Sequence, residues 1–256
     1  MFRWKATAAV IGVAALTLVG CSSSPSDSGT ESKELVLGQI IAQNTFDTTQ
    51  AEWGNRSLYN QAVYDTLLLA TADGGIEPFL ATDYSYNDDN TELTLTIRDD
   101  VTFTDGTKLT ADVVKQNLEH FRDGGGTFAS DLVNVASVDA PDDTTVVLTL
   151  SAPDPALLIY LTHEAGLIAS PAMFGAEDAA TNPIGSGPYI LDLDATVTGT
   201  SYVYTKNPDY WNPDLQHYDK VTMSVLSDPT AAFTSPALIA LTAAVGSDST
   251  LIVTLS

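Results

Sequence analysis

Residues 93–114 read LTLTIRDDVTFTDGTKLTADVV, and this stretch decides the fold of the chain. Apolar and polar residues alternate over 93–98, which is the period-two pattern of a strand with one buried face. A second, short strand is expected over 101–103, and the Asp-Gly pair at 105–106 marks a tight turn after it. The stretch therefore predicts two strands in succession before any helix.

A helix is predicted next, beginning after Thr110, because a threonine side chain there can accept a hydrogen bond from an unpaired first-turn amide. The helix is expected to run to about Arg122 and to stop at the three glycines of 124–126. Before the alternating strand, the polar cluster of 87–90 predicts a turn, so that residues 84–86 and the strand form a hairpin. Strands and helices thus mix along the chain, and the predicted fold class is α/β, in the mixed α+β sense.

Four other short stretches carry motifs that belong together with residues 93–114. They are YDTLL at 64–68, GIEPFLA at 75–81, NPIGSGPY at 182–189 and KNPDYW at 206–211. With the first stretch, and in this order, they resemble the extracytoplasmic solute-binding proteins of peptide, nickel and oligosaccharide ABC importers. The resemblance covers roughly residues 34–232, which are expected to form the first lobe of a periplasmic-binding-protein-like fold, truncated before the second lobe.

The resemblance implies a ligand receptor rather than an enzyme, with no cofactor. Members hold a small solute, such as a peptide, between two lobes that close by a hinge motion, and then dock on an ABC permease and ATPase complex. The loop of Thr45, Phe46 and Asp47 is expected to contact the ligand, because it follows the first strand at 35–38 as cleft-facing loops in this family do. The family usually carries Asp-Pro in this loop, whereas here Thr48 stands in place of the proline.

The first residues predict export and a lipid anchor. Arg3 and Lys5 precede an apolar run of about 14 residues, which is short for a membrane span, and small residues lead into Cys21. Residues 1–20 are therefore expected to be a lipoprotein signal peptide, and Cys21 resembles the lipidated cysteine of bacterial lipoproteins. Residues 21–33 are predicted to be a flexible tether. The expected location is the extracytoplasmic face of the bacterial cell membrane.

The charge balance excludes one class of partner. Asp plus Glu number 33 against 10 for Lys plus Arg, and the net charge is −23. Removal of the signal leaves 33 acidic against 8 basic side chains. Such an acidic surface repels phosphate backbones, so nucleic-acid binding is not expected. Because Cys21 is the only cysteine, an intramolecular disulfide is not possible.

Groups with catalytic or metal-binding spacing are sparse. His120, His163 and His217 are widely separated, and none stands in a metal-ligand pair, so each is interpreted as a surface or packing residue. Ser186 lacks the spacing of a nucleophile elbow and is interpreted as part of a tight turn. A lipid-anchored hydrolase is one alternative function, but it would need a nucleophile and base. A sensor or adhesion lipoprotein on the same scaffold is another.

A helix is predicted over 53–64 with Leu58, Ala62 and Val63 facing inward.

Aromatic residues leave two interpretations open. Flat rings suit a ligand cleft, and they equally suit a packed core, which is the commoner role. The rings concerned are Trp53, Tyr59, Phe103, Tyr189, Tyr204, Tyr210 and Trp211.

The last residues are related to the coding sequence that precedes them. Ordinary GC-rich codons for residues 219–232, reverse-complemented and read one base out of phase, encode AAVGSDSTLIVTLS, which is residues 243–256 in order. Residues 233–256 are therefore expected to be a non-native antisense tail, produced by a fold-back rearrangement or an assembly chimera. The second lobe would then be missing, and this chain alone would not complete a ligand cleft.

Overall fold

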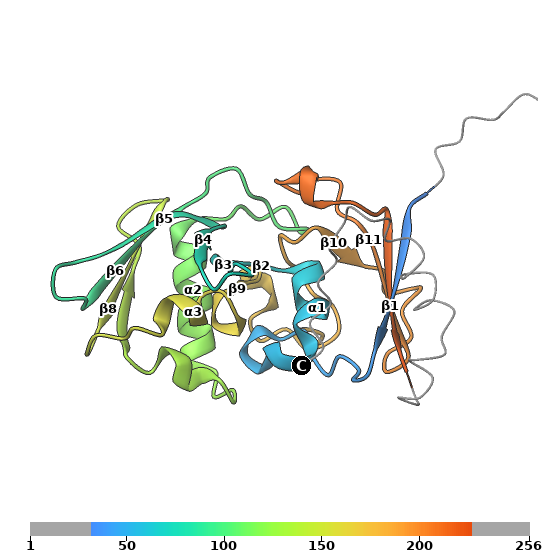
Figure 1. Cartoon of the computed structure of the whole chain (residues 1–256), viewed down its shortest axis with the longest axis horizontal. Helices are drawn as coiled ribbons and strands as arrows, with labels where there is room; N and C mark the ends of the chain where they lie inside the picture. The colour runs from blue at the N-terminus through green and yellow to red at the C-terminus, as the bar shows by residue number, and fades with distance from the viewer. Residues whose placement is uncertain (1–31, 227–256) are drawn as a thin grey trace, which may run out of the picture. The chain divides into compact units, whose positions relative to one another are not determined.

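The computed structural model describes residues 32–226. The predicted signal peptide, Cys21 and the tail of 233–256 lie outside the described residues. No helix within 32–226 has the length and apolar character needed to cross a membrane. Two four-stranded sheets, two smaller strand pairs and the helices between them make up this part of the chain (Figure 1).

The first sheet joins the two ends of the described chain. Its strand order is β1-β12-β11-β10, with β1 parallel to β12 and the other neighbours antiparallel. The parallel pairing sets Glu34 opposite Lys220, across 186 residues of sequence. The strands are β1 (Glu34–Gln39), β10 (Tyr189–Leu191), β11 (Ser201–Lys206) and β12 (Lys220–Val225).

The second sheet is built from one continuous part of the chain, and all its neighbours are antiparallel. Its order is β5-β6-β8-β7, and Leu93, Leu95 and Ile97 of β6 are buried, as their alternation predicts. The hairpin with its turn at 87–90 is also confirmed. The strands are β5 (Ala81–Tyr86), β6 (Glu92–Ile97), β7 (Val135–Asp139) and β8 (Thr145–Leu150).

Three α-helices, five short 3-10 helices and two short strand pairs complete the described chain. The helices are α1 (Trp53–Val63), α2 (Ala111–Asp123) and α3 (Leu157–Tyr160). The strand pairs are β2 (Asp65–Thr66) with β9 (Leu167–Ile168), and β3 (Leu68–Ala70) with β4 (Ile76–Pro78). Helix α2 begins as predicted, because the Thr110 side chain accepts a hydrogen bond from the amide of Val113.

The buried apolar residues form two clusters. One lies between α2 and the second sheet and includes the leucines of β6 and β8. The other lies between α1 and the first sheet and is rich in tyrosine. Each sheet thus buries one face against one helix, which is the usual way for an amphipathic layer to exclude water.

Two local predictions were wrong. No strand forms over 101–103, where only an isolated bridge joins Thr102 to Lys108, because the chain turns back at Gly106 with a φ of 86° before a ladder can extend. Leu58 was expected to face inward but is 46% exposed, whereas Ala62 and Val63 are buried as predicted. The apolar stripe of α1 instead runs through Tyr59, because this ring packs against Tyr202 of the first sheet.

Candidate functional site

The loop predicted to contact ligand is held firmly by its own side chains. The Asp47 carboxylate accepts hydrogen bonds from the backbone N–H and the hydroxyl of Thr49, at 3.0 and 2.9 Å. It thereby caps the short helix η1 (Thr48–Gln50). The Thr45 hydroxyl in turn accepts from the Asp47 N–H at 3.0 Å. The Asp47 cap therefore orders this loop although position 48 is a threonine.

Phe46 and its neighbours differ in exposure. Phe46 is 3% exposed and lies in the tyrosine-rich cluster, whereas Thr45 and Asp47 are half-buried. Ligand contact by these three residues remains a prediction. In this structure the side chain of Phe46 serves the core, so Thr45 and Asp47 are the two that retain exposed surface.

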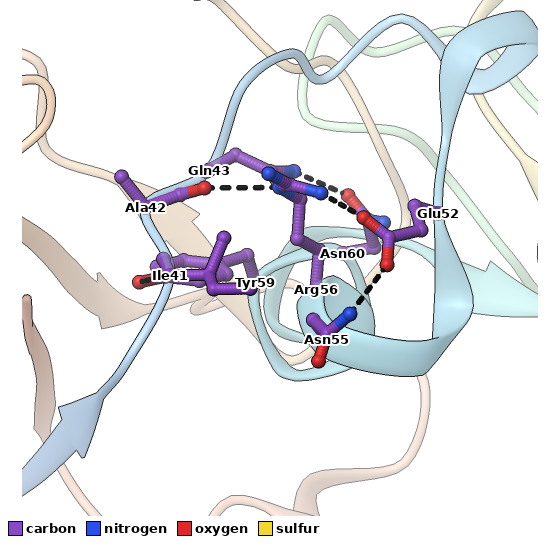
Figure 2. Close-up of polar contacts among 8 residues, drawn as sticks. All are labelled: Ile41, Ala42, Gln43, Glu52, Asn55, Arg56, Tyr59 and Asn60. Atoms are coloured by element: carbon purple, nitrogen blue, oxygen red, sulfur yellow. Dashed lines mark hydrogen bonds and ion pairs between the residues drawn. The ribbon is translucent and has the colours of Figure 1, made fainter. Parts of the chain in front are cut away.

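Polar contacts fasten the segment before this loop to α1 (Figure 2). Arg56 donates to the Ala42 carbonyl at 2.9 Å and forms an ion pair with Glu52. Asn60 lies one turn further along α1, and its side-chain oxygen accepts a hydrogen bond from the Gln43 side-chain amide at 2.6 Å. These contacts fix where the chain leaves β1 and therefore where the loop lies.

A buried carboxylate joins the sequence motifs to one another. Asp65 of β2 is 3% exposed, and one of its oxygens accepts from the Ser186 hydroxyl and the Trp211 indole N–H, both at 2.9 Å. The other oxygen accepts from the Tyr210 hydroxyl at 3.1 Å. We call these four residues the Asp65 junction. Burial raises the pKa of Asp65 to about 6, although the three donors and the nearby Arg98 each act to lower it.

The junction gives the motif of residues 182–189 a structural role beyond a tight turn. Ser186 was interpreted as part of a tight turn, and the structure shows that its hydroxyl is buried and bonded to Asp65. The glycines beside it are needed for space, because a Cβ on Gly187 would lie 2.5 Å from the Val63 carbonyl carbon. Gly187 instead donates its N–H to the Val63 carbonyl oxygen at 3.0 Å.

An open hollow of about 420 Å³ lies beside the junction. The Arg98 guanidinium sits 4.0 Å above the Trp211 ring, and Phe79 meets the same ring edge-on at 5.2 Å. Arg98 is also held by a two-bond ion pair with Asp100. The remaining lining residues are Leu69, Pro78, Thr82, Asn212 and Leu215.

The other aromatic candidates divide clearly. Trp53 and Trp211 keep partly exposed rings and are the members of the predicted set that remain open to a ligand. The buried members are Tyr59, Phe103, Tyr189, Tyr204 and Tyr210. Packing in the core accounts for these five rings.

The histidines do not form a metal site. His120 stacks on Phe174 at 4.3 Å, His163 lies tilted against Trp53 at 5.1 Å, and His217 is exposed. Within residues 32–226, no group of three or more His, Cys, Asp or Glu side chains is arranged to hold a metal ion.

Comparison with known proteins decides the family. The sequence profile described as bacterial extracellular solute-binding proteins, family 5 Middle, matches residues 75–235. The chain belongs to this family. The family 5 match covers the second sheet, the Asp65 partners Ser186, Tyr210 and Trp211, and strand β12.

Individual relatives agree with the family. The glutathione-binding protein GsiB of Escherichia coli O1:K1 / APEC is 28% identical over 223 residues, which cover 85% of this chain and 42% of GsiB. GsiB of Shigella dysenteriae serotype 1 (strain Sd197) is 30% identical over 198 residues, covering 74% and 38%. This family 5 chain therefore spans about two-fifths of the length of the curated relatives that it matches.

Solved structures confirm the periplasmic-binding-protein fold. The binding protein AgaA in complex with agropinic acid, from A. tumefacien R10, superimposes with a TM-score of 0.71 at 29% identity, covering 78% of this chain and 41% of AgaA. The murein tripeptide binding protein MppA of Escherichia coli gives a TM-score of 0.72 at 22% identity, covering 80% and 44%. Because MppA is only 22% identical, its similarity concerns the fold alone.

Proposed function

We propose that this chain is the N-terminal part of the substrate-binding lipoprotein of an ABC importer, which captures a peptide or a similar small solute and delivers it to a membrane permease. The observation that carries the proposal is the match to family 5 over 75–235, together with a fold that brings its separate motifs to one buried carboxylate. A receptor of this kind needs no covalent chemistry on its ligand.

Three further features complete the proposal. Cys21 carries the lipid that keeps the receptor at the extracytoplasmic face of the membrane, and residues 21–33 tether it. Residues 34–232 are the native receptor segment, and residues 233–256 are the antisense tail. Thr45 and Asp47 contact the solute from the loop after β1, with Phe46 supporting them from the core.

The proposed solute class is supported by the relatives. GsiB is named a glutathione-binding protein, and glutathione is itself a small peptide. Two solved structures with the same fold contain agropinic acid and the peptide RPPGFSPFR, so the scaffold accommodates different solutes. We therefore infer a peptide-like solute for the complete receptor, bound between this lobe and a second one.

The test is to restore the complete receptor from the genomic nucleotide sequence across codons 215–256 and beyond. The purified receptor is titrated with glutathione and with a mixture of di- and oligopeptides in a calorimeter, and each peptide is afterwards analysed for cleavage. We expect saturable binding of an intact solute. Cleavage of the peptides would favour the hydrolase, and absence of any bound solute would overturn the proposal.

A further inference from the structure

Trp53, at the start of α1, contacts His163, and Asp131 and Glu164 lie on the two short helices packed around His163. Trp53 is the first residue of α1, and its ring lies 5.1 Å from that of His163, with the two planes 32° apart. Glu164 opens the short helix η3 (Glu164–Gly166), and Asp131 lies on η2 (Ala129–Leu132), which contacts η3. Both rings are half-buried, so each keeps a part that faces solvent.

Glu164 is the unusual member of this group. It is only 5% exposed, yet its Oε2 atom is buried and has no hydrogen-bond partner among residues 32–226. A buried polar atom without a partner costs roughly 1–3 kcal/mol, and more when it is charged, so such atoms in native proteins call for a specific reason. One reason is a ligand that supplies the missing donor.

The charges around Glu164 indicate which donor would fit. Asp131 is half-buried, and its charge adds to burial in raising the pKa of Glu164. The charged neighbours of Asp131 itself are His163 and Asp154, and burial lowers the pKa of His163, which favours its neutral form. Within residues 32–226, the charges that act on Asp131 and Glu164 include no lysine or arginine, and two neighbouring carboxylates are costly unless a cation arrives.

We propose that Trp53, Asp131, His163 and Glu164 form a subsite for a cationic group of the solute, a guanidinium or a side-chain ammonium. A cation placed against the exposed face of Trp53 is attracted by the ring's electrons, and Arg-like groups do this best. The same group donates hydrogen bonds to the carboxylates, which are strongest when both partners are charged. The subsite rests on the proposed function, because it assigns a side-chain preference to the same solute.

The experiment uses two probes that differ in charge but not in shape. N-acetyl-L-arginine amide carries one guanidinium and no free amine, whereas N-acetyl-L-citrulline amide is its neutral counterpart. Residues 21–256 contain two tryptophans, Trp53 and Trp211, so a fluorescence change that Trp53→Phe removes reports binding at Trp53. We expect the arginine probe to change the fluorescence saturably, with a Kd at least tenfold lower than that of the citrulline probe.

Variants assign the effect to the subsite. Glu164→Gln and Asp131→Asn should each weaken binding of the arginine probe at least tenfold, and Trp53→Phe should remove most of the fluorescence change. Asp89→Asn is the matched control, since it removes one negative charge from the exposed turn between β5 and β6 and should leave the Kd unchanged. Circular dichroism of each variant checks that the chain is folded.

The outcomes separate the subsite from the general function. Equal affinity for the two probes, or equal loss in Asp89→Asn and Glu164→Gln, would overturn the subsite. The same probes and variants are then tested on the complete receptor. If the complete receptor binds peptides without preferring cationic ones, the proposed function stands and the subsite is overturned. If the complete receptor binds no solute but the chain still binds the arginine probe more tightly than the citrulline probe, the subsite stands and the proposed function is overturned.

Discussion

Replacing Asp65 by asparagine and by alanine tests how the buried junction is held together. In the native protein, three donors point at two carboxylate oxygens that are almost completely buried. An asparagine oxygen in the position of Oδ2 can still accept from Ser186 and Trp211. Its NH₂ group in the position of Oδ1 can donate to the Tyr210 hydroxyl, which accepts as well as donates. Asp65→Asn therefore preserves the hydrogen bonds and removes the charge.

The magnitude follows from the pKa of Asp65, which rises from 3.8 to about 6 on folding. Each unit is about 1.4 kcal/mol, so ionisation of Asp65 costs the folded state about 3 kcal/mol. Because the folded protein binds this proton more tightly than the unfolded chain, stability from this group is greatest below pH 4. It falls as the pH rises from about 4 to about 6, and is level above that range.

The assay is urea unfolding of the native chain and both variants between pH 4 and 7.5, followed by circular dichroism. The free energy of unfolding of the native chain, minus that of Asp65→Asn, should fall by about 2.4 kcal/mol as the pH rises through this window, because the unfolded carboxyl is already partly ionised at pH 4. At neutral pH, Asp65→Ala should be destabilised by about 3 kcal/mol or more, because the Trp211 indole N–H cannot turn to another acceptor. A difference between native and Asp65→Asn that stays constant with pH would refute the reasoning.

Three other predictions concern the close contact between Gly187 and the Val63 carbonyl, the lipid anchor at Cys21 and the tail of residues 233–256. Gly187→Ala should cost roughly 3 kcal/mol or more in urea unfolding, because its Cβ would overlap the Val63 carbonyl, whereas Gly54→Ala on the open face of α1 should be neutral or stabilising by about 0.5–1 kcal/mol. Cys21→Ser should leave a protein that no longer partitions with membranes, and unchanged lipid labelling of that variant would exclude Cys21 as the acylated residue. Deletion of residues 233–256 should improve solubility without lowering the melting temperature, and a large loss of stability would argue that the tail is a native element.

Several local elements of this fold, though not the short strand expected over 101–103, could be predicted from neighbouring residues alone. The alternation over 93–98 predicts a strand whose leucines are buried, and the structure confirms it. Thr110 and the glycines of 124–126 predict both ends of α2. These signals work because a strand's two faces and a helix's first unpaired amides are set by residues at most four positions apart.

The candidate site depended on contacts that no local pattern contains. The sequence motifs showed the family, but Asp65 meets Ser186 and Trp211 across 121 and 146 residues, and nothing in either stretch marks the hydroxyl or the indole as a partner of this carboxylate. The same is true of Trp53 and His163, which lie on separate elements. Periodicity fixes which side of an element is buried, whereas the identity of the group on the other side is decided only when sheets and helices pack, because that contact depends on the position of every element between them.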